Sequence, residues 1–94
     1  MARTTKPTTI DDIRSTLGSN VKKFRKDRFA QETLALEAGL DRTMVSKIER
    51  GVTSPSLETL LKIANTLGVG VHELLQPVAA AEVPAQGQKR QRGL

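Results

Sequence analysis

Apolar residues recur at spacings of three and four along residues 10–75 of this 94-residue chain, and glycines end the successive runs. Such spacing places apolar side chains on one face of a helix. Gly39, Gly51 and Gly68 each follow a run, where glycine commonly ends a helix by adopting a left-handed conformation. No run alternates with the period of two that is typical of a strand. The pattern therefore predicts an all-α fold of five helices.

Polar residues that favour helix starts divide the chain further. Thr9 and Asp12 have the Thr-x-x-acid spacing of a capping box, so the first helix is expected to start at residue 10. Asp41 and Ser56 are suitable N-caps for the third and fourth helices. The later helices are predicted at residues 31–38, 42–50, 57–67 and 71–76.

The same spacing predicts which side chains face the core. The first helix is expected to bury an apolar stripe along its length, the second and third helices a few residues each, and the fourth helix a row of leucines. The expected inward residues are Ile10, Ile13, Leu17, Val21, Phe24, Leu34, Ala35, Ala38, Leu40, Val45, Ile48, Leu57, Leu60, Leu61, Ala64 and Leu67.

The composition excludes several classes of function. With no Cys and one His, the chain lacks the usual ligands of a zinc site and cannot form a disulfide. Phe24 and Phe29 are its only aromatic residues, which argues against binding single strands by base stacking. No apolar run approaches the roughly 20 residues of a membrane span. No cofactor or metal is expected.

The charge is uneven along the chain, whose net charge is +5. Residues 10–28 carry six basic and three acidic side chains, whereas residues 29–76 sum to −2. Residues 1–9 have no periodicity and are predicted to be a flexible arm, and residues 77–94 a disordered basic tail. The folded domain is therefore expected at residues 10–76, with an anionic partner.

The most informative segment runs from Gln31 to Arg50, where two short predicted helices flank Gly39. A small residue, Ala35, allows the two helices to cross closely, and Gly39 tolerates the positive φ of a sharp turn. Burial of the apolar residues leaves Arg42, Thr43, Ser46 and Lys47 on the outer side of the second of these helices. Residues in a first turn reach base edges when a helix enters the major groove by its N-terminal end.

Five groups of residues, from Gln31 to Leu75, resemble the lambda-repressor-like (Cro/CI, or XRE) helix-turn-helix family. The resemblance covers about 60 residues of the chain, and spacing, turns and core agree together. The matching groups are Gln31-Glu32-x-Leu34-Ala35, Ala38-Gly39, Val45-Ser46-x-Ile48-Glu49-x-Gly51, Pro55-Ser56-Leu57-x-Thr59-Leu60 and Leu67-Gly68-Val69 with Glu73-Leu74-Leu75.

The resemblance implies a compact five-helix DNA-binding domain whose helix 42–50 is the recognition helix. It implies a cytoplasmic, nucleoid-associated regulator of a prokaryotic or phage type, and no enzyme. Arg25 and Glu49 match a family salt bridge. The implied base contacts are Arg42, Thr43 and Lys47, and the expected phosphate contacts are Gln31, Ser46, Arg50, Thr53, Lys22 and Arg28.

Two departures from the family pattern stand out. The connection between Arg25 and Gln31 is one residue shorter than usual, which leaves the position of Phe29 open. Gly70 replaces the Ser or Thr that caps the last helix in many relatives, so that helix is expected to fray.

Several assignments stay open at this point. The family implies a homodimer on a pseudo-palindromic operator, with Val69, Val71 and Leu75 as candidate interface residues. One alternative is an antitoxin, which binds a toxin protein and regulates its own operon. Another is an architectural or coactivator-like module that binds a protein partner and has no preferred DNA sequence. Lys22 and the basic residues near it are either a solvated face or a surface that steers DNA.

Overall fold

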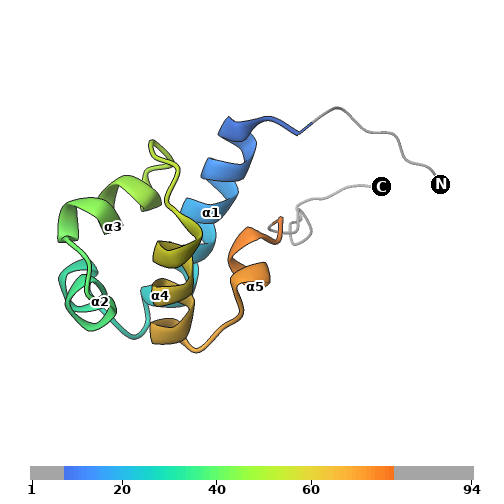
Figure 1. Cartoon of the computed structure of the whole chain (residues 1–94). Coiled ribbons are helices and arrows are strands. Elements are labelled where there is room, and N and C mark those ends of the chain that lie inside the picture. Colours follow the sequence, from blue (N-terminus) through green and yellow to red (C-terminus); the bar gives the residue numbers. More distant parts are fainter. Residues whose placement is uncertain (1–7, 78–94) are drawn as a thin grey trace.

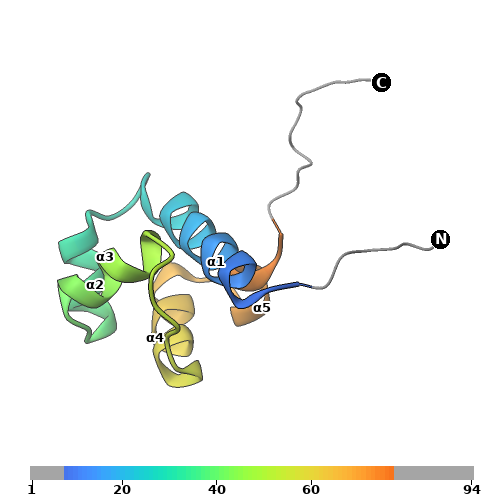
Figure 2. The ribbon, with the colours of Figure 1, turned by 90° about the horizontal axis from the view of Figure 1, so that it is seen from above.

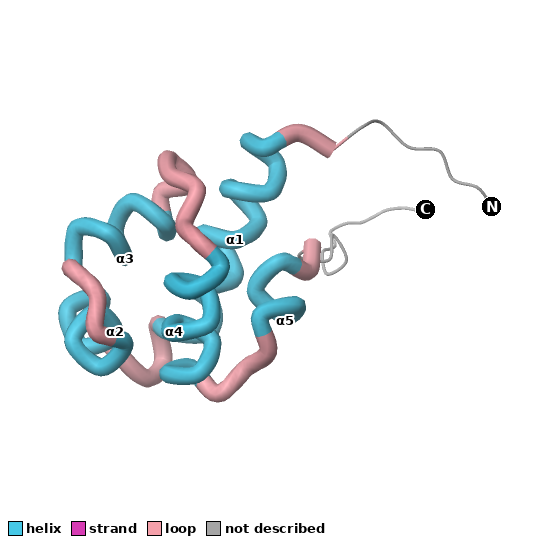
Figure 3. The backbone as a smooth tube through the Cα atoms, viewed as in Figure 1, coloured by secondary structure: helices cyan, strands magenta, loops and turns pink. Residues whose placement is uncertain are grey.

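A computed structural model of the chain describes residues 8–77, and the predicted arm and tail lie almost entirely outside these residues. Five helices make up this part: α1 (Ile10–Arg25), α2 (Gln31–Ala38), α3 (Arg42–Glu49), α4 (Leu57–Leu67) and α5 (Val71–Leu75) (Figure 1). The predicted all-α, five-helix fold is confirmed, and residues 8–77 contain no strand. Figure 3 shows that the helices are joined by short loops. Two helices end one residue earlier than predicted, at Glu49 and Leu75.

The predicted caps of α1 and α4 are present. The Thr9 N–H donates to the Asp12 carboxylate and the Asp12 N–H donates to the Thr9 hydroxyl, each at 3.1 Å. At α4, the Thr59 N–H donates to the Ser56 hydroxyl at 3.1 Å. Asp41 occupies the N-cap position of α3, but its side chain makes no capping hydrogen bond. The first turn of α3 is closed by the backbone instead, since the Asp41 carbonyl accepts from the Met44 and Val45 N–H groups at 3.0 and 3.3 Å.

The start of α5 at Gly70 is stabilised by the Glu73 side chain and not by the Ser or Thr cap of the family pattern. The Gly70 N–H donates to the Glu73 carboxylate at 2.8 Å. At the other end, Asn20, which is buried in α1, donates to the carbonyls of Leu74 and Gln76 at 2.8 and 2.7 Å. Both ends of α5 are thus held, and the expected fraying is not supported by these contacts.

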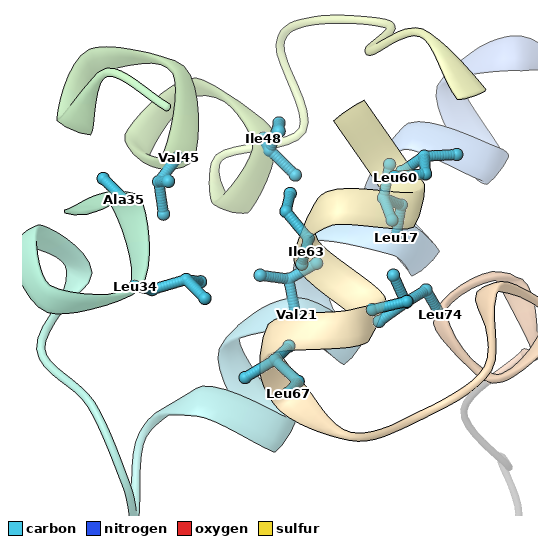
Figure 4. Packing of buried hydrophobic residues seen from close by; sticks show 11 residues of the cluster. Leu17, Val21, Leu34, Ala35, Val45, Ile48, Leu60, Ile63, Leu67 and Leu74 are labelled. Atoms are coloured by element: carbon cyan, nitrogen blue, oxygen red, sulfur yellow. The ribbon is translucent and has the colours of Figure 1, made fainter. Parts of the chain in front are cut away.

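The core lies where all five helices meet (Figure 4). α1 contacts both α3 and α5. α4 contacts α2 on one side and α5 on the other (Figures 1 and 2). The side chains that are less than 2% exposed come from all five helices. The largest of them are Val21, Leu34, Val45, Ile48, Ile63, Leu67 and Leu74.

Four residues expected in the core are exposed. Ile10 and Ile13 are 54% and 42% exposed, because the first turns of α1 extend beyond the helices that cover Leu17. In α4 the buried stripe is Leu60, Ile63, Ala64 and Leu67. This stripe follows the i, i+3, i+4, i+7 spacing of a helix face. The predicted stripe omitted Ile63, and the leucines flanking it, Leu57 and Leu61, are 75% and 52% exposed.

Candidate nucleic-acid interface

Helices α2 and α3 form a compact unit at one end of the molecule (Figure 1). Gly39 connects them with φ +73°, and the Leu40 N–H after it donates to the Ala35 carbonyl at 2.8 Å. Ala35 is 3% exposed and lies beside Val45 of α3 at the helix crossing (Figure 4). A small side chain and a left-handed turn therefore set the angle between α2 and α3, as the sequence predicted.

The outer side of α3 carries the three residues expected to contact bases. Arg42, Thr43 and Lys47 are exposed, whereas Val45 and Ile48 on the inner side are fully buried. Helix α3 therefore presents one buried apolar face and one solvent-facing face of hydrogen-bond donors and acceptors.

An open surface depression lies where the first turn of α3 meets the start of α2. Gln31, Arg42, Thr43 and Ser46 line it. The structure thus brings together one residue expected to contact phosphate on α2, another on α3, and two of the three expected base contacts. Lys47, one turn farther along α3, does not line the depression.

A buried hydrogen-bonded cluster lies behind this depression. The Arg25 guanidinium donates to both carboxylate oxygens of Glu49, one of them through Nη2 at 2.9 Å. Gln31 Nε2 donates to the same carboxylate at 2.9 Å. The side chains of Arg25 and Glu49 are only 12% and 4% exposed. This cluster connects the end of α1, the start of α2 and the last residue of α3, so it fixes the place of α3 in the fold.

Close backbone contact also positions α3 on α1. A Cβ atom on Gly18 would lie 2.5 Å from the Ile48 carbonyl oxygen and 2.7 Å from that of Glu49. The two helices therefore approach to a distance that no side chain at residue 18 permits. Gly18 was not among the predicted structural residues, because an isolated glycine inside a helical run gives no sign of the partner it approaches.

The short connection between α1 and α2 places Arg28 and Phe29. The backbone N–H groups of both residues donate to the Arg25 carbonyl at 2.8 Å, and Phe29 packs half-buried against the core. The Arg28 guanidinium lies 5.1 Å from the centre of the Phe29 ring and donates to the Leu67 carbonyl at the end of α4. Arg28 thus contacts α4 in this protein and does not line the depression beside α3.

The other residues expected to contact phosphate lie on separate elements. Lys22 is exposed on α1, Arg50 is exposed directly after α3, and Thr53 is half-buried in the loop before α4. The loop itself is held against α1, because Arg14 Nε donates to the Ser54 hydroxyl at 2.8 Å. The interface candidates thus extend from α1 across α2 and α3 to this loop.

Within residues 8–77, no three His, Cys, Asp or Glu side chains gather closely enough to hold a metal ion. No helix of the described part is long and apolar enough to cross a membrane.

A family model of helix-turn-helix domains, HTH_3, matches residues 21–74, which is more than half of the chain. The chain belongs to this helix-turn-helix family. The match starts near the end of α1 and spans α2, α3, α4 and nearly all of α5.

Several proteins similar to this chain are named as transcription factors or control proteins. A hypothetical transcription factor from Neisseria meningitidis is 42% identical over 67 residues, which are 70% of this chain and 63% of that protein. The crystal structure of a Neisseria factor of the same description has a TM-score of 0.71 at 34% identity, over 86% of this chain and 94% of that one.

Two control proteins are also similar. Control protein C.BamHI of Bacillus amyloliquefaciens is 42% identical over 67 residues, which are 69% of this chain and 83% of that protein. A variant of C.Esp1396I, solved bound to an operator site, has a TM-score of 0.57 at 30% identity, over 68% of this chain and 96% of that one.

Proposed function

We propose that this protein is a transcriptional regulator without enzymatic activity that binds a specific double-stranded DNA sequence as a homodimer. Its recognition helix, α3 with Arg50, would lie in the major groove. The observation that carries this proposal is the geometry of α3. Its inner face is locked to α1 and α2, and its first turn presents Arg42 and Thr43 beside Gln31 and Ser46. Such rigid presentation is what base readout requires.

The side chains on α3 suit the edges of base pairs. An arginine such as Arg42 can donate two parallel hydrogen bonds to O6 and N7 of a guanine, which discriminates by about 1–3 kcal/mol. Thr43 offers a hydroxyl to a base and a methyl group to a thymine. Lys47, one turn on, reaches a base or a phosphate.

The residues around α3 suit the sugar-phosphate backbone. Gln31 lies at the N-terminus of α2, where the helix dipole favours an anion, and its amide is oriented by the Glu49 carboxylate. Ser46, Arg50, Thr53 and Lys22 are the other proposed phosphate contacts. Arg28 is included with them, although one of its N–H groups is engaged by the Leu67 carbonyl. These contacts would set the register of α3 on the duplex and attract any sequence.

Two copies are needed because one α3 makes few base contacts. A single module of this size discriminates over too few base pairs for useful specificity. A two-fold dimer doubles the number of base pairs that are read, and it places two half-sites about one helical turn, roughly 10 base pairs, apart. The expected operator is therefore a pseudo-palindrome.

Control of a restriction–modification operon is a more specific candidate. C.Esp1396I is a restriction–modification controller protein, and its operator-bound variant is matched over 96% of its chain. The similarity to C.BamHI extends over 83% of that control protein. A reporter fused to the promoter that precedes this gene tests the idea. We expect added protein to change expression of this reporter, and endonuclease and methyltransferase genes should lie beside this gene. The absence of such genes would contradict a role in restriction–modification control.

Selection of bound sites from random duplex DNA tests the main proposal. The purified full-length protein should enrich a pseudo-palindrome with half-sites about 10 base pairs apart. An unchanged pool after repeated rounds would contradict sequence-specific binding, and it would favour a module that binds protein.

A further inference from the structure

The N-terminal half of α4 presents an apolar stripe that no other part of residues 8–77 covers. Leu57 and Leu61 are 75% and 52% exposed, and they lie one turn apart on the same side of the helix. Large apolar side chains that adjoin on a surface mark contact sites more often than isolated ones do. The stripe flanks the buried face of α4 and does not belong to it.

Two charged residues of opposite sign border this stripe. Glu58 and Lys62 follow the two leucines directly, are both exposed and also lie one turn apart. Within residues 8–77, neither of them takes part in an ion pair. The surface therefore repeats one unit twice, a leucine followed by a charge, with negative charge in the first repeat and positive charge in the second.

We infer that this surface, Leu57, Glu58, Leu61 and Lys62, is the contact between two copies of the chain, with the two α4 helices antiparallel about a two-fold axis. In that arrangement Leu57 of one copy packs on Leu61 of the other. Glu58 likewise meets Lys62, and each pair occurs twice. A two-fold interface must be complementary to itself, and this order of charges meets that requirement. The inference rests on the proposed function, since it supplies the dimer that an operator with two half-sites requires.

The place of the surface in the fold connects dimer formation to DNA reading. The loop that follows α3 leads directly to the start of α4, and it is held on α1 by Arg14 and Ser54. Gly51 in this loop also lies against the α1 backbone. A Cβ atom on Gly51 would lie 3.5 Å from the Arg14 carbonyl oxygen. A contact at the start of α4 therefore fixes the distance between the two α3 helices.

This surface differs from the one predicted from the sequence. Of Val69, Val71 and Leu75, the two valines are half-buried and pack against the protomer's own core. Leu75 is 38% exposed. The α4 surface exposes more apolar side chain and carries the complementary charges that the α5 surface lacks.

Sedimentation of the full-length protein without DNA tests the inference. The unsubstituted protein should dimerise, and Leu61→Glu should raise the dimer dissociation constant roughly 30-fold or more, the size of a hot-spot loss. Leu36→Glu is the matched control, because Leu36 is 77% exposed on α2 and should leave the dimer unchanged. Circular dichroism checks that each variant is folded.

Mixing two charge variants gives a second test that does not depend on a leucine. Glu58→Lys and Lys62→Glu should each be monomeric alone, because like charges then face one another. Mixed in equal amounts they should form a heterodimer, since each contact regains opposite charges.

Three outcomes would overturn the inference: a monomeric unsubstituted protein, a dimer that Leu61→Glu leaves intact, and no heterodimer on mixing. A dimer lost in Leu75→Glu but kept in Leu61→Glu would place the interface on α5. None of these outcomes depends on DNA, so site selection tests the proposed function separately.

Discussion

The two faces of α3 have contrasting surroundings. The inner face places Val45 and Ile48 in the core, and the helix ends at Glu49, whose carboxylate accepts hydrogen bonds from two other helices. The outer face exposes Arg42, Thr43 and Lys47 to solvent. The inner contacts determine where the helix lies, and the outer residues are those proposed to bind DNA. Substitutions on the two faces should therefore change different quantities.

Removing the Glu49 carboxylate should have the largest effect on stability. Glu49→Ala deprives Arg25 and Gln31 of their shared acceptor and leaves the Arg25 charge largely buried. Breaking a buried ion pair by removing one partner costs about 3–5 kcal/mol of unfolding free energy. Urea unfolding measures the loss. Glu37→Ala, at an exposed residue of α2, is the control and should stay within about 0.5 kcal/mol of the unsubstituted protein. Equal losses in the two variants would show that the cluster does not hold α3.

Gly18→Ala tests the close contact between α1 and α3, and the sign of its effect is informative. Helix propensity alone predicts that alanine stabilises α1 by about 1 kcal/mol over glycine. The added methyl group would lie 2.5 Å from the Ile48 carbonyl oxygen, and relief requires the backbone to shift. We expect a net loss of about 1–3 kcal/mol, as for an overpacked core. Ser19→Ala, at the next and exposed residue, controls for propensity, and a stabilised Gly18→Ala protein would contradict the contact.

The sequence predicted the helix bounds of this protein, but not the long-range contacts that hold the helices together. The predicted helix bounds follow from local signals, such as the Thr9 and Ser56 caps and the glycines that follow the second, third and fourth helices, and the structure reproduces these bounds within one residue. Gly18 and Asn20 went unnoticed because their partners lie far along the chain, at Ile48 and Leu74. No periodicity encodes a contact of that kind.

The α4 leucines were predicted wrongly for a related reason. Leu57 and Leu61 share one side of the helix, and their apolarity alone suggested burial. Which side faces the core depends on the helices that pack there, and these select Ile63 in place of the two leucines. The local pattern thus identifies an amphipathic helix, but the fold decides which of its apolar residues are available to a partner.

Arg42→Ala should leave stability unchanged and alter DNA recognition. The side chain is exposed and packs on nothing in the core, so unfolding free energy should stay within about 0.5 kcal/mol. Binding to the selected operator should weaken by about 1–3 kcal/mol for the guanine contact in each half-site, and preference should relax at that base pair alone. Gel-shift titrations on the operator, on a duplex changed at that base pair and on random DNA measure this. Equal weakening on all three duplexes would exclude base readout by Arg42.

Lys22→Ala should have the smallest effect, and one that is independent of sequence. Lys22 is exposed on α1, outside the depression beside α3, so it can contribute through phosphate attraction without reading a base. Each phosphate contact releases counterions. Its loss should therefore make the negative slope of log affinity against log salt shallower by about 0.9 per protomer. Affinity for the operator and for random DNA should fall by the same factor. Lys22→Arg keeps the charge and should keep the slope. If Lys22→Ala instead changed base preference with an unaltered slope, the separation between residues that position DNA and residues that read it would not hold for α1.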